Sequence, residues 1–224
     1  EITTRLVGSE MCIRDRYIVQ NNKNMVSQGQ YYNPLPSLYL FPRGDNFDEI
    51  RLYERYNTNY GYMEQYWPYG DASLSLQNPY WIQNRINRTS NKKRYMMNAS
   101  LKWQAADWLN VVGRVNLDNS DYRNKNEKSA STLTTFCGVS GGFEDAMRQE
   151  RSLYADFLAN IDKTFGDFHL TANVGASIYH TSMDQLYIAG DLVIPNFFQI
   201  NNINFSANSV SYTHLRAHET RSNL

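Results

Sequence analysis

The chain has 224 residues, with 22 Lys and Arg side chains balanced by 22 Asp and Glu side chains. No basic field argues for nucleic acid, and no run of 18 apolar residues predicts a transmembrane helix. This composition does not exclude a membrane β-barrel, because the strands of such a barrel need only alternate apolar and polar residues.

The two ends differ in composition from the Tyr- and Asn-rich sequence between them. Codons for residues 1–16 can be written as the reverse complement of codons for residues 209–224, and the match stops at Tyr17 against Asn208. Such an inverted repeat resembles a translated sequencing adaptor. We therefore expect residues 1–16 and 209–224 to be non-native tails around residues 17–208, and set them aside from fold reasoning. His214, His218 and Cys12 then carry no metal or disulfide chemistry, which leaves Cys137 as the one native cysteine.

Residues 17–22 are expected to be the stub of a strand, and a long link follows over residues 23–94. Within this link, Asn46 is a predicted N-cap, with Glu49 three residues on and Phe47, Ile50 and Tyr53 along one helix face. The link is also dense in aromatic residues. Five of them are candidates to stack on sugar rings or on a partner, with packing of the loop on itself as the alternative: Tyr66, Trp67, Tyr69, Tyr80 and Trp81.

Four strands with a period of two are predicted from there on, over residues 95–103, 109–118, 153–162 and 168–179. Each pair is joined by a short link, residues 104–108 and 163–167, so two tight hairpins are expected. The link of residues 119–151 between them is long and holds Gly138-Val139-Ser140-Gly141-Gly142. This matches the G-x-S-x-G pattern of hydrolases, but no buried strand precedes the serine, and a loop tip is expected.

Short links at one end and long links at the other are typical of an outer-membrane barrel, whose short turns are periplasmic and whose long loops are extracellular. Strands of nine to twelve residues suit a tilted crossing of the bilayer. Four strands and a stub are too few to close a barrel. The predicted fold is therefore all-β: an incomplete antiparallel meander from a large outer-membrane β-barrel with long extracellular loops.

Several motifs carry a family resemblance: KNMVSQGQYYNPLPSLYLFPRGDNFDEIRLYERY, QYWPYGD, LQNPYWIQNR, KKRYMMNASLKWQAADWLNVVGRVNLDN, YADFLANIDKTFGDFHLTANVGAS and IPNFFQINNIN. In this order they resemble the central barrel of the SusC/RagA family of TonB-linked outer-membrane proteins. The resemblance implies a transporter in the bacterial outer membrane that imports oligosaccharides, peptides or other bulky nutrients. It also implies a SusD-like surface lipoprotein as lid, and a TonB complex that acts through an N-terminal plug.

Alternate residues of a strand face opposite sides, so the charged residues between the apolar positions are predicted to face the barrel lumen. A water-filled interior needs polar residues in any case. The five residues are Lys102, Arg114, Asp118, Asp156 and Asp162. His169 lies on the same polar face and is expected to be solvated. No cofactor is expected. An enzyme is disfavoured, since no carboxylate pair, nucleophile with base, or metal cluster stands out. The alternative function is a soluble or surface carbohydrate-binding β-sheet module that uses the aromatic loop directly.

Overall fold

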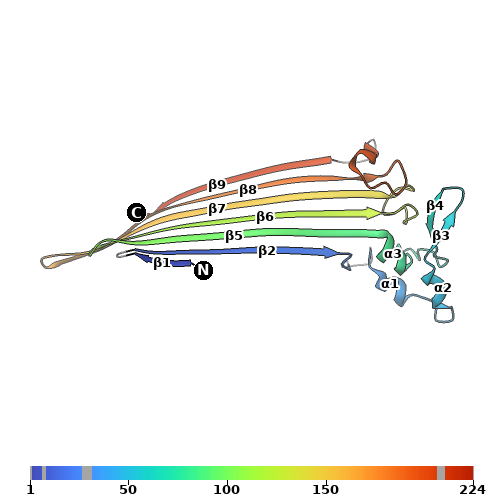
Figure 1. Cartoon of the computed structure of the whole chain (residues 1–224), viewed down its shortest axis with the longest axis horizontal. Helices are drawn as coiled ribbons and strands as arrows, with labels where there is room; N and C mark the ends of the chain where they lie inside the picture. The colour runs from blue at the N-terminus through green and yellow to red at the C-terminus, as the bar shows by residue number, and fades with distance from the viewer. Residues whose placement is uncertain (1, 7–8, 27–31, 206–209, 224) are drawn as a thin grey trace.

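The computed structural model describes residues 2–6, 9–26, 32–205 and 210–223. Most of the chain forms one seven-stranded antiparallel sheet in the order β1-β2-β5-β6-β7-β8-β9. Figure 1 shows its strands as long ribbons that lie side by side. The described strands at the two edges, β1 and β9, do not pair with each other, so the sheet is open. The all-β meander is confirmed. The strand count is not, since four strands and a stub were expected.

The strands of this sheet follow one another as hairpins, except where residues 24–85 leave it between β2 and β5. Their bounds are Ile2–Leu6 for β1, Ser9–Lys23 for β2, Ile86–Ala106 for β5, Leu109–Lys128 for β6, Gly142–Phe165 for β7, Phe168–Asp191 for β8 and Val210–Asn223 for β9. The predicted short links are confirmed as two-residue turns. Gly166 takes a positive φ of 60° in the second turn, a conformation that glycine adopts at no steric cost.

The register brings the predicted apolar positions of four strands into common rows. Ala99 lies opposite Val115, Val115 opposite Ala155, and Ala155 opposite Ile178. Paired residues of an antiparallel sheet share a face, and alternate residues repeat it. One face therefore carries a continuous apolar band over the half of the sheet next to the short turns. Its members are Tyr95, Met97, Ala99, Leu101, Trp103, Leu109, Val111, Gly113, Val115, Leu117, Leu153, Ala155, Phe157, Ala159, Ile161, Leu170, Ala172, Val174, Ala176 and Ile178.

Beyond the apolar band the strands continue well past their predicted ends. β6 runs ten residues beyond Asp118 to Lys128, and β7 begins eleven residues before Leu153. The predicted long link of residues 119–151 therefore shrinks to residues 129–141, and that of residues 23–94 to residues 24–85. These strand halves are mostly polar and lack strict apolar alternation, so the sequence pattern does not reveal them, while backbone pairing continues along the ladder regardless of side-chain type.

A cap of short elements lies at the far end of the strands, at the right of Figure 1. It contains α1 (Pro34–Tyr39), α2 (Phe47–Arg51), β3 (Glu54–Asn57), β4 (Tyr62–Gln65), α3 (Pro79–Arg85) and the 3-10 turn η1 (Ile200–Asn202). The side chain of Asn46 accepts a hydrogen bond from the Asp48 amide, which confirms the predicted N-cap of α2. The helix ends at Arg51, however, so Tyr53 does not continue its face.

The buried core of the described chain lies in this cap and at the strand ends that adjoin it. Trp81, Ile82 and Ile86 form one buried cluster, and Phe143, Leu192 and Ile203 form another. Gly141 closes the loop of residues 129–141 with a φ of 97°, where an added Cβ would lie 2.4 Å from the Lys128 carbonyl oxygen. The cap is therefore a packed unit that holds the loops in place, whereas both faces of the open sheet remain largely accessible.

The expected non-native tails are strands wherever they are described. β1 and the first part of β2 lie within residues 1–16, and β9 pairs with β8 from Ile188↔Val210 to Gly175↔Asn223. An open edge offers unpaired backbone groups to any neighbouring strand, so this pairing carries no information about the origin of the tails. The predicted boundary at residues 208 and 209 falls outside the described residues.

Cys137 illustrates how closely the cap is packed. Burial raises the pKa of its thiol to about 11, from an ordinary value of 9.0. We therefore expect alkylation of Cys137 by iodoacetamide at pH 8 to be about 100-fold slower in the folded chain than in urea, because the thiolate is the reactive species. Mass spectrometry of a Cys12→Ser variant would measure both rates. Equal rates would contradict the burial.

The same pKa shift gives a direction for stability. Because the folded state disfavours the thiolate, the contribution of Cys137 to the free energy of unfolding is complete below pH 9. It is lost as the pH rises towards about 11.

Candidate functional site

Four charged side chains on the polar face of the sheet form two cross-strand ion pairs. Arg114 on β6 and Asp156 on β7 are register partners, and Arg114 Nε donates to Asp156 Oδ1 at 2.9 Å. Arg94 on β5 binds Asp118 on β6 through two hydrogen bonds, of 2.9 Å from Nε and 2.5 Å from Nη2. The structure thus brings together predicted residues Arg114 and Asp156 and adds Arg94, which the sequence reasoning missed.

The other two charged candidates lie on the same face but apart from these pairs. Lys102 pairs in register with Val112, is exposed, and has no ion-pair partner among the described residues. Asp162 Oδ1 lies 3.2 Å from Nε2 of His169, so His169 has a carboxylate neighbour that the sequence reasoning did not foresee. The five residues therefore share a face without forming one site.

Three of the predicted aromatic residues meet in the cap. Trp67 and Tyr69 are in edge contact at 5.0 Å between ring centroids, Phe41 links Tyr69 to Phe47 at 5.1 and 5.2 Å, and Phe47 lies 6.2 Å from Tyr80. We call Phe41, Phe47, Trp67, Tyr69 and Tyr80 the aromatic cluster. None of the five residues is fully buried, and Phe47 is exposed. Phe41 and Phe47 are the members that the sequence reasoning missed.

Trp81 differs from the other candidates because its side chain has no exposed surface. Its indole nitrogen donates to Thr132 Oγ1 at 3.1 Å, and its ring packs against Ile82 and Ile86. The structure therefore gives Trp81 a packing role. Tyr66 is half-buried under the guanidinium of Arg55, which lies 3.4 Å from the ring centroid.

Amide side chains hold the aromatic cluster in place. Asn78 is fully buried, donates to the carbonyl oxygens of Ile50 at 2.8 Å and Tyr66 at 2.9 Å, and caps α3 by accepting from the Tyr80 amide. Gln65 and Gln77 are joined at 3.1 Å, and Gln77 also accepts from the Leu133 amide. Asn78 is fully satisfied in this way, which fixes one loop conformation around the aromatic cluster. Gln77 Nε2 is buried without a hydrogen-bond partner among the described residues.

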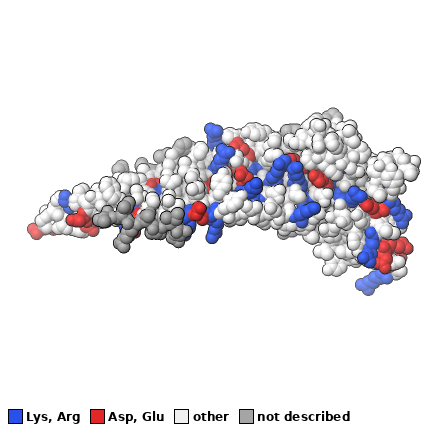
Figure 2. Space-filling model, viewed as in Figure 1, with Lys and Arg blue, Asp and Glu red and all other residues white. Residues whose placement is uncertain are grey.

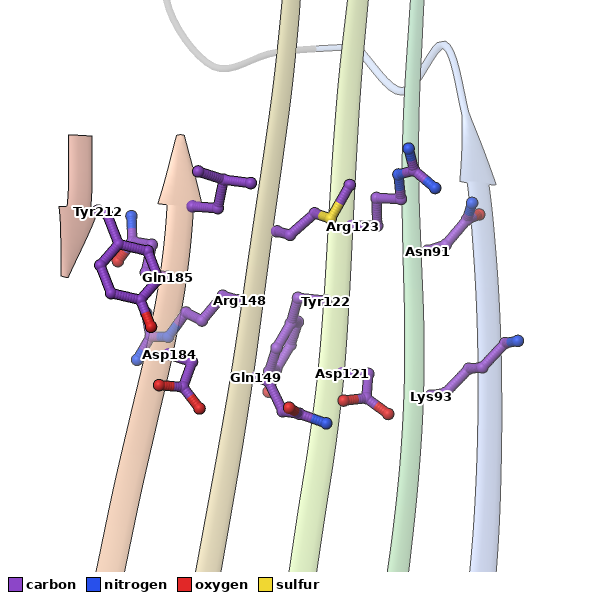
Figure 3. A pocket seen from close by; sticks show the side chains of 12 residues that line it. Asn91, Lys93, Asp121, Tyr122, Arg123, Arg148, Gln149, Asp184, Gln185 and Tyr212 are labelled. Carbon is purple, nitrogen blue, oxygen red and sulfur yellow. The ribbon is translucent and has the colours of Figure 1, made fainter. Parts of the chain in front are cut away.

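A shallow groove of about 580 Å³ crosses the sheet beyond the apolar band, on the same face (Figure 3). It is lined by Asn91 and Lys93 on β5, Asp121 and Arg123 on β6, Gln149 on β7 and Asp184 on β8, and Tyr212 closes it from β9. The guanidinium of Arg123 makes two hydrogen bonds to the buried Asp145, which raise the pKa of Arg123. The groove has side chains of both charges, and Tyr212 belongs to an expected non-native tail. The lining residues therefore do not indicate one class of ligand.

Catalytic arrangements find little support in the described residues. The loop from Gly138 to Gly142 leads directly into strand β7 and not into a helix, which is wrong for a nucleophile elbow. No group of three or more His, Cys, Asp or Glu side chains within the described ranges is placed to hold a metal ion. Among the described helices, none is long and apolar enough to span a bilayer.

The residues that sequence reasoning missed have only weak features in the sequence that could have revealed them. Arg94 lies one residue before a predicted strand, and only the register shows that it reaches Asp118. Tyr60 and Tyr62 stack at 5.6 Å on the β3–β4 hairpin, within a segment whose hairpin was not predicted. Comparison with known proteins adds no assignment: neither a family model nor a curated protein matches the chain.

Proposed function

We propose that the chain is a central segment of a SusC-like, TonB-linked transporter barrel in the bacterial outer membrane. The observation that supports this best is the apolar band. It lies on one face of four consecutive strands, in register, and is opposed by a face with paired charges. A soluble open sheet has no reason to present such a band to water.

The limits of the band fit a bilayer. Along β7 the apolar positions run from Leu153 to Ile161, with Arg151 and Lys163 as the next residues on that face. This length of nine residues lies at the lower end of the roughly nine to eleven that a tilted barrel strand needs to cross the bilayer. In Figure 2 the visible Lys, Arg, Asp and Glu atoms gather over the middle and the capped end of the sheet, with more at the opposite tip.

The cap and the polar face acquire roles within this proposal. The cap lies on the extracellular side, where the aromatic cluster contacts oligosaccharide or peptide cargo or a SusD-like lipoprotein lid. Arg114, Asp118, Asp156, Asp162 and Lys102 line the water-filled interior. Energy comes from a TonB complex, which acts through a plug. These roles rest on the sequence resemblance and on the preorganised, partly exposed rings of Trp67, Tyr69 and Tyr80.

The second candidate function is a carbohydrate-binding module that works without a membrane. The aromatic cluster favours it, because these rings lie in the cap, away from the apolar band. Detergent dependence separates the two candidates. A transporter segment needs detergent to stay monodisperse, whereas a soluble module does not.

A spin-label scan tests the orientation of the sheet. With Cys12→Ser and Cys137→Ala as background, single nitroxide labels are placed at Ala99, Val115, Ala159 and Ala172, and at Asn98, Asn116, Asn160 and Asn173. In lipid vesicles we expect the first set to be more accessible to oxygen and the second to a water-soluble nickel chelate, because oxygen partitions into hydrocarbon.

Adjacent pairs such as Val115 and Asn116 act as matched controls, since they share a depth and differ only in face. If the nickel chelate reached both sets equally, the apolar face would be in water and the membrane proposal would fail.

A further inference from the structure

Lys163 is the single charged side chain on the apolar face of β5 to β8 between the Arg151 row and the short turns, counted over the described residues. It pairs in register with Leu170, between the rows Ile161↔Ala172 and Phe165↔Phe168. The lysine therefore stands at the lower border of the apolar band.

Aromatic rings hold the Lys163 ammonium on two sides. Its Nζ lies 4.6 Å from the ring centroid of Trp108 and 5.0 Å from that of Phe165. None of the described carboxylates forms an ion pair with it, and the adjacent Asp162 contacts His169 on the opposite face. Rings stabilise a cation but neutralise no charge, so the ammonium retains capacity for an anion.

Trp108 supplies a second donor beside this cation. It occupies the turn between β5 and β6 and is 39% exposed. No acceptor for its indole nitrogen is found among the described residues. A phosphate has several oxygens, so it can accept a charged hydrogen bond from Lys163 with one oxygen and a neutral one from the Trp108 indole with another. Leu170, 50% exposed, lies opposite Lys163 and leads to Ala172 in the apolar band, whereas Phe168, 80% exposed, lies on the turn side of the lysine.

Each of the two short turns beyond the lysine contains an aspartate. Asp107 belongs to the turn that holds Trp108, and Asp167 to the two-residue turn that follows Phe165. Outward from the apolar band the order along these strands is the Lys163 row, then the Phe165 and Phe168 row, then the two turns with their carboxylates. A phospholipid with an ammonium headgroup has the complementary order: acyl chain, phosphate, amine. A net anionic headgroup would place negative charge beside Asp107 and Asp167.

We propose that Lys163 and Trp108 bind the phosphate of a phospholipid whose headgroup is a primary amine, as in phosphatidylethanolamine. This inference rests on the proposed membrane function. The ammonium of the lipid lies towards Asp107 and Asp167, and its acyl chains lie along Leu170 and Ala172.

Lipid titration of the full chain in a non-ionic detergent tests the site, with bound lipid counted by native mass spectrometry. Phosphatidylethanolamine, phosphatidylglycerol and phosphatidylcholine with identical acyl chains are compared. We expect phosphatidylethanolamine to bind most tightly, and Lys163→Gln to weaken it about tenfold, the effect of losing one charge-assisted hydrogen bond. Lys163→Arg should retain binding, and Asp167→Asn should reduce the preference over phosphatidylglycerol.

Lys102→Gln is the matched control, because Lys102 is an exposed lysine on the opposite face, and it should change nothing. Equal binding of the three lipids, or no response to Lys163→Gln, would overturn the lipid site. The proposed membrane function would still stand in that case, provided that the chain needs detergent to stay monodisperse. Tighter binding of phosphatidylglycerol would overturn the choice of headgroup. A chain that is monodisperse without detergent would instead refute the proposed function itself.

Discussion

Replacing Phe157 by arginine is expected to prevent stable insertion of the sheet into a bilayer. Phe157 lies in the central row of the apolar band, opposite Gly113 on β6 and Ala176 on β8. Arginine at the midplane on the lipid side costs ~2–4 kcal/mol, and the lost phenylalanine burial costs about 2 kcal/mol more. The folded fraction in vesicles should fall at least 100-fold. Urea titration of the full chain in lipid vesicles, followed by tryptophan fluorescence, measures this loss.

Leu158→Arg provides the control for this experiment. Leu158 follows Phe157 directly, points to the polar face, and shares its row with Lys102 and Val112. The same new charge at nearly the same depth should cost less than about 1 kcal/mol there, because water reaches that face. An equal loss for both variants would mean that lipid does not distinguish the two faces, which the proposed function requires.

The half of the sheet next to the short turns could be predicted because its side chains alternate strictly. Trp103, Val111, Ala159 and Val174 were placed on one face from sequence and indeed share a row in the register. The polar halves escaped prediction, since runs such as residues 119–128 lack apolar alternation. Their strands are fixed by pairing with neighbours, which is information that no local window contains.

The candidate sites divide in the same way. Parity predicted the face of Arg114 and Asp156, but their contact depends on the register between β6 and β7. Aromatic density made Trp67, Tyr69 and Trp81 candidates for stacking on a ligand, yet density does not separate exposed rings from buried ones. Only the packing of α3 against the loop of residues 129–141 shows that Trp81 is a core residue.

The Trp81→Ala variant is expected to unfold much of the cap while leaving the apolar half of the sheet intact. The change removes a fully buried ring and its hydrogen bond to Thr132, and it empties the centre of the cluster with Ile82 and Ile86. Loss of a buried aromatic side chain costs ~3–5 kcal/mol. Because the cap has its own core, that cost is concentrated in local opening. Hydrogen exchange of residues 32–85 and 129–141, measured by mass spectrometry, should accelerate by at least 100-fold.

Trp67→Ala is the comparison that makes this result specific. Trp67 is partly exposed, bonds only locally to the Gly70 carbonyl at 2.7 Å, and contacts Tyr69. Its removal should cost about 1 kcal/mol, and exchange in residues 129–141 should stay unchanged. Equal acceleration in both variants would mean that the cap has no core around Trp81. The preorganisation that underlies a binding role for the aromatic cluster would then be lost, whereas the membrane orientation of the sheet would stand on its own test.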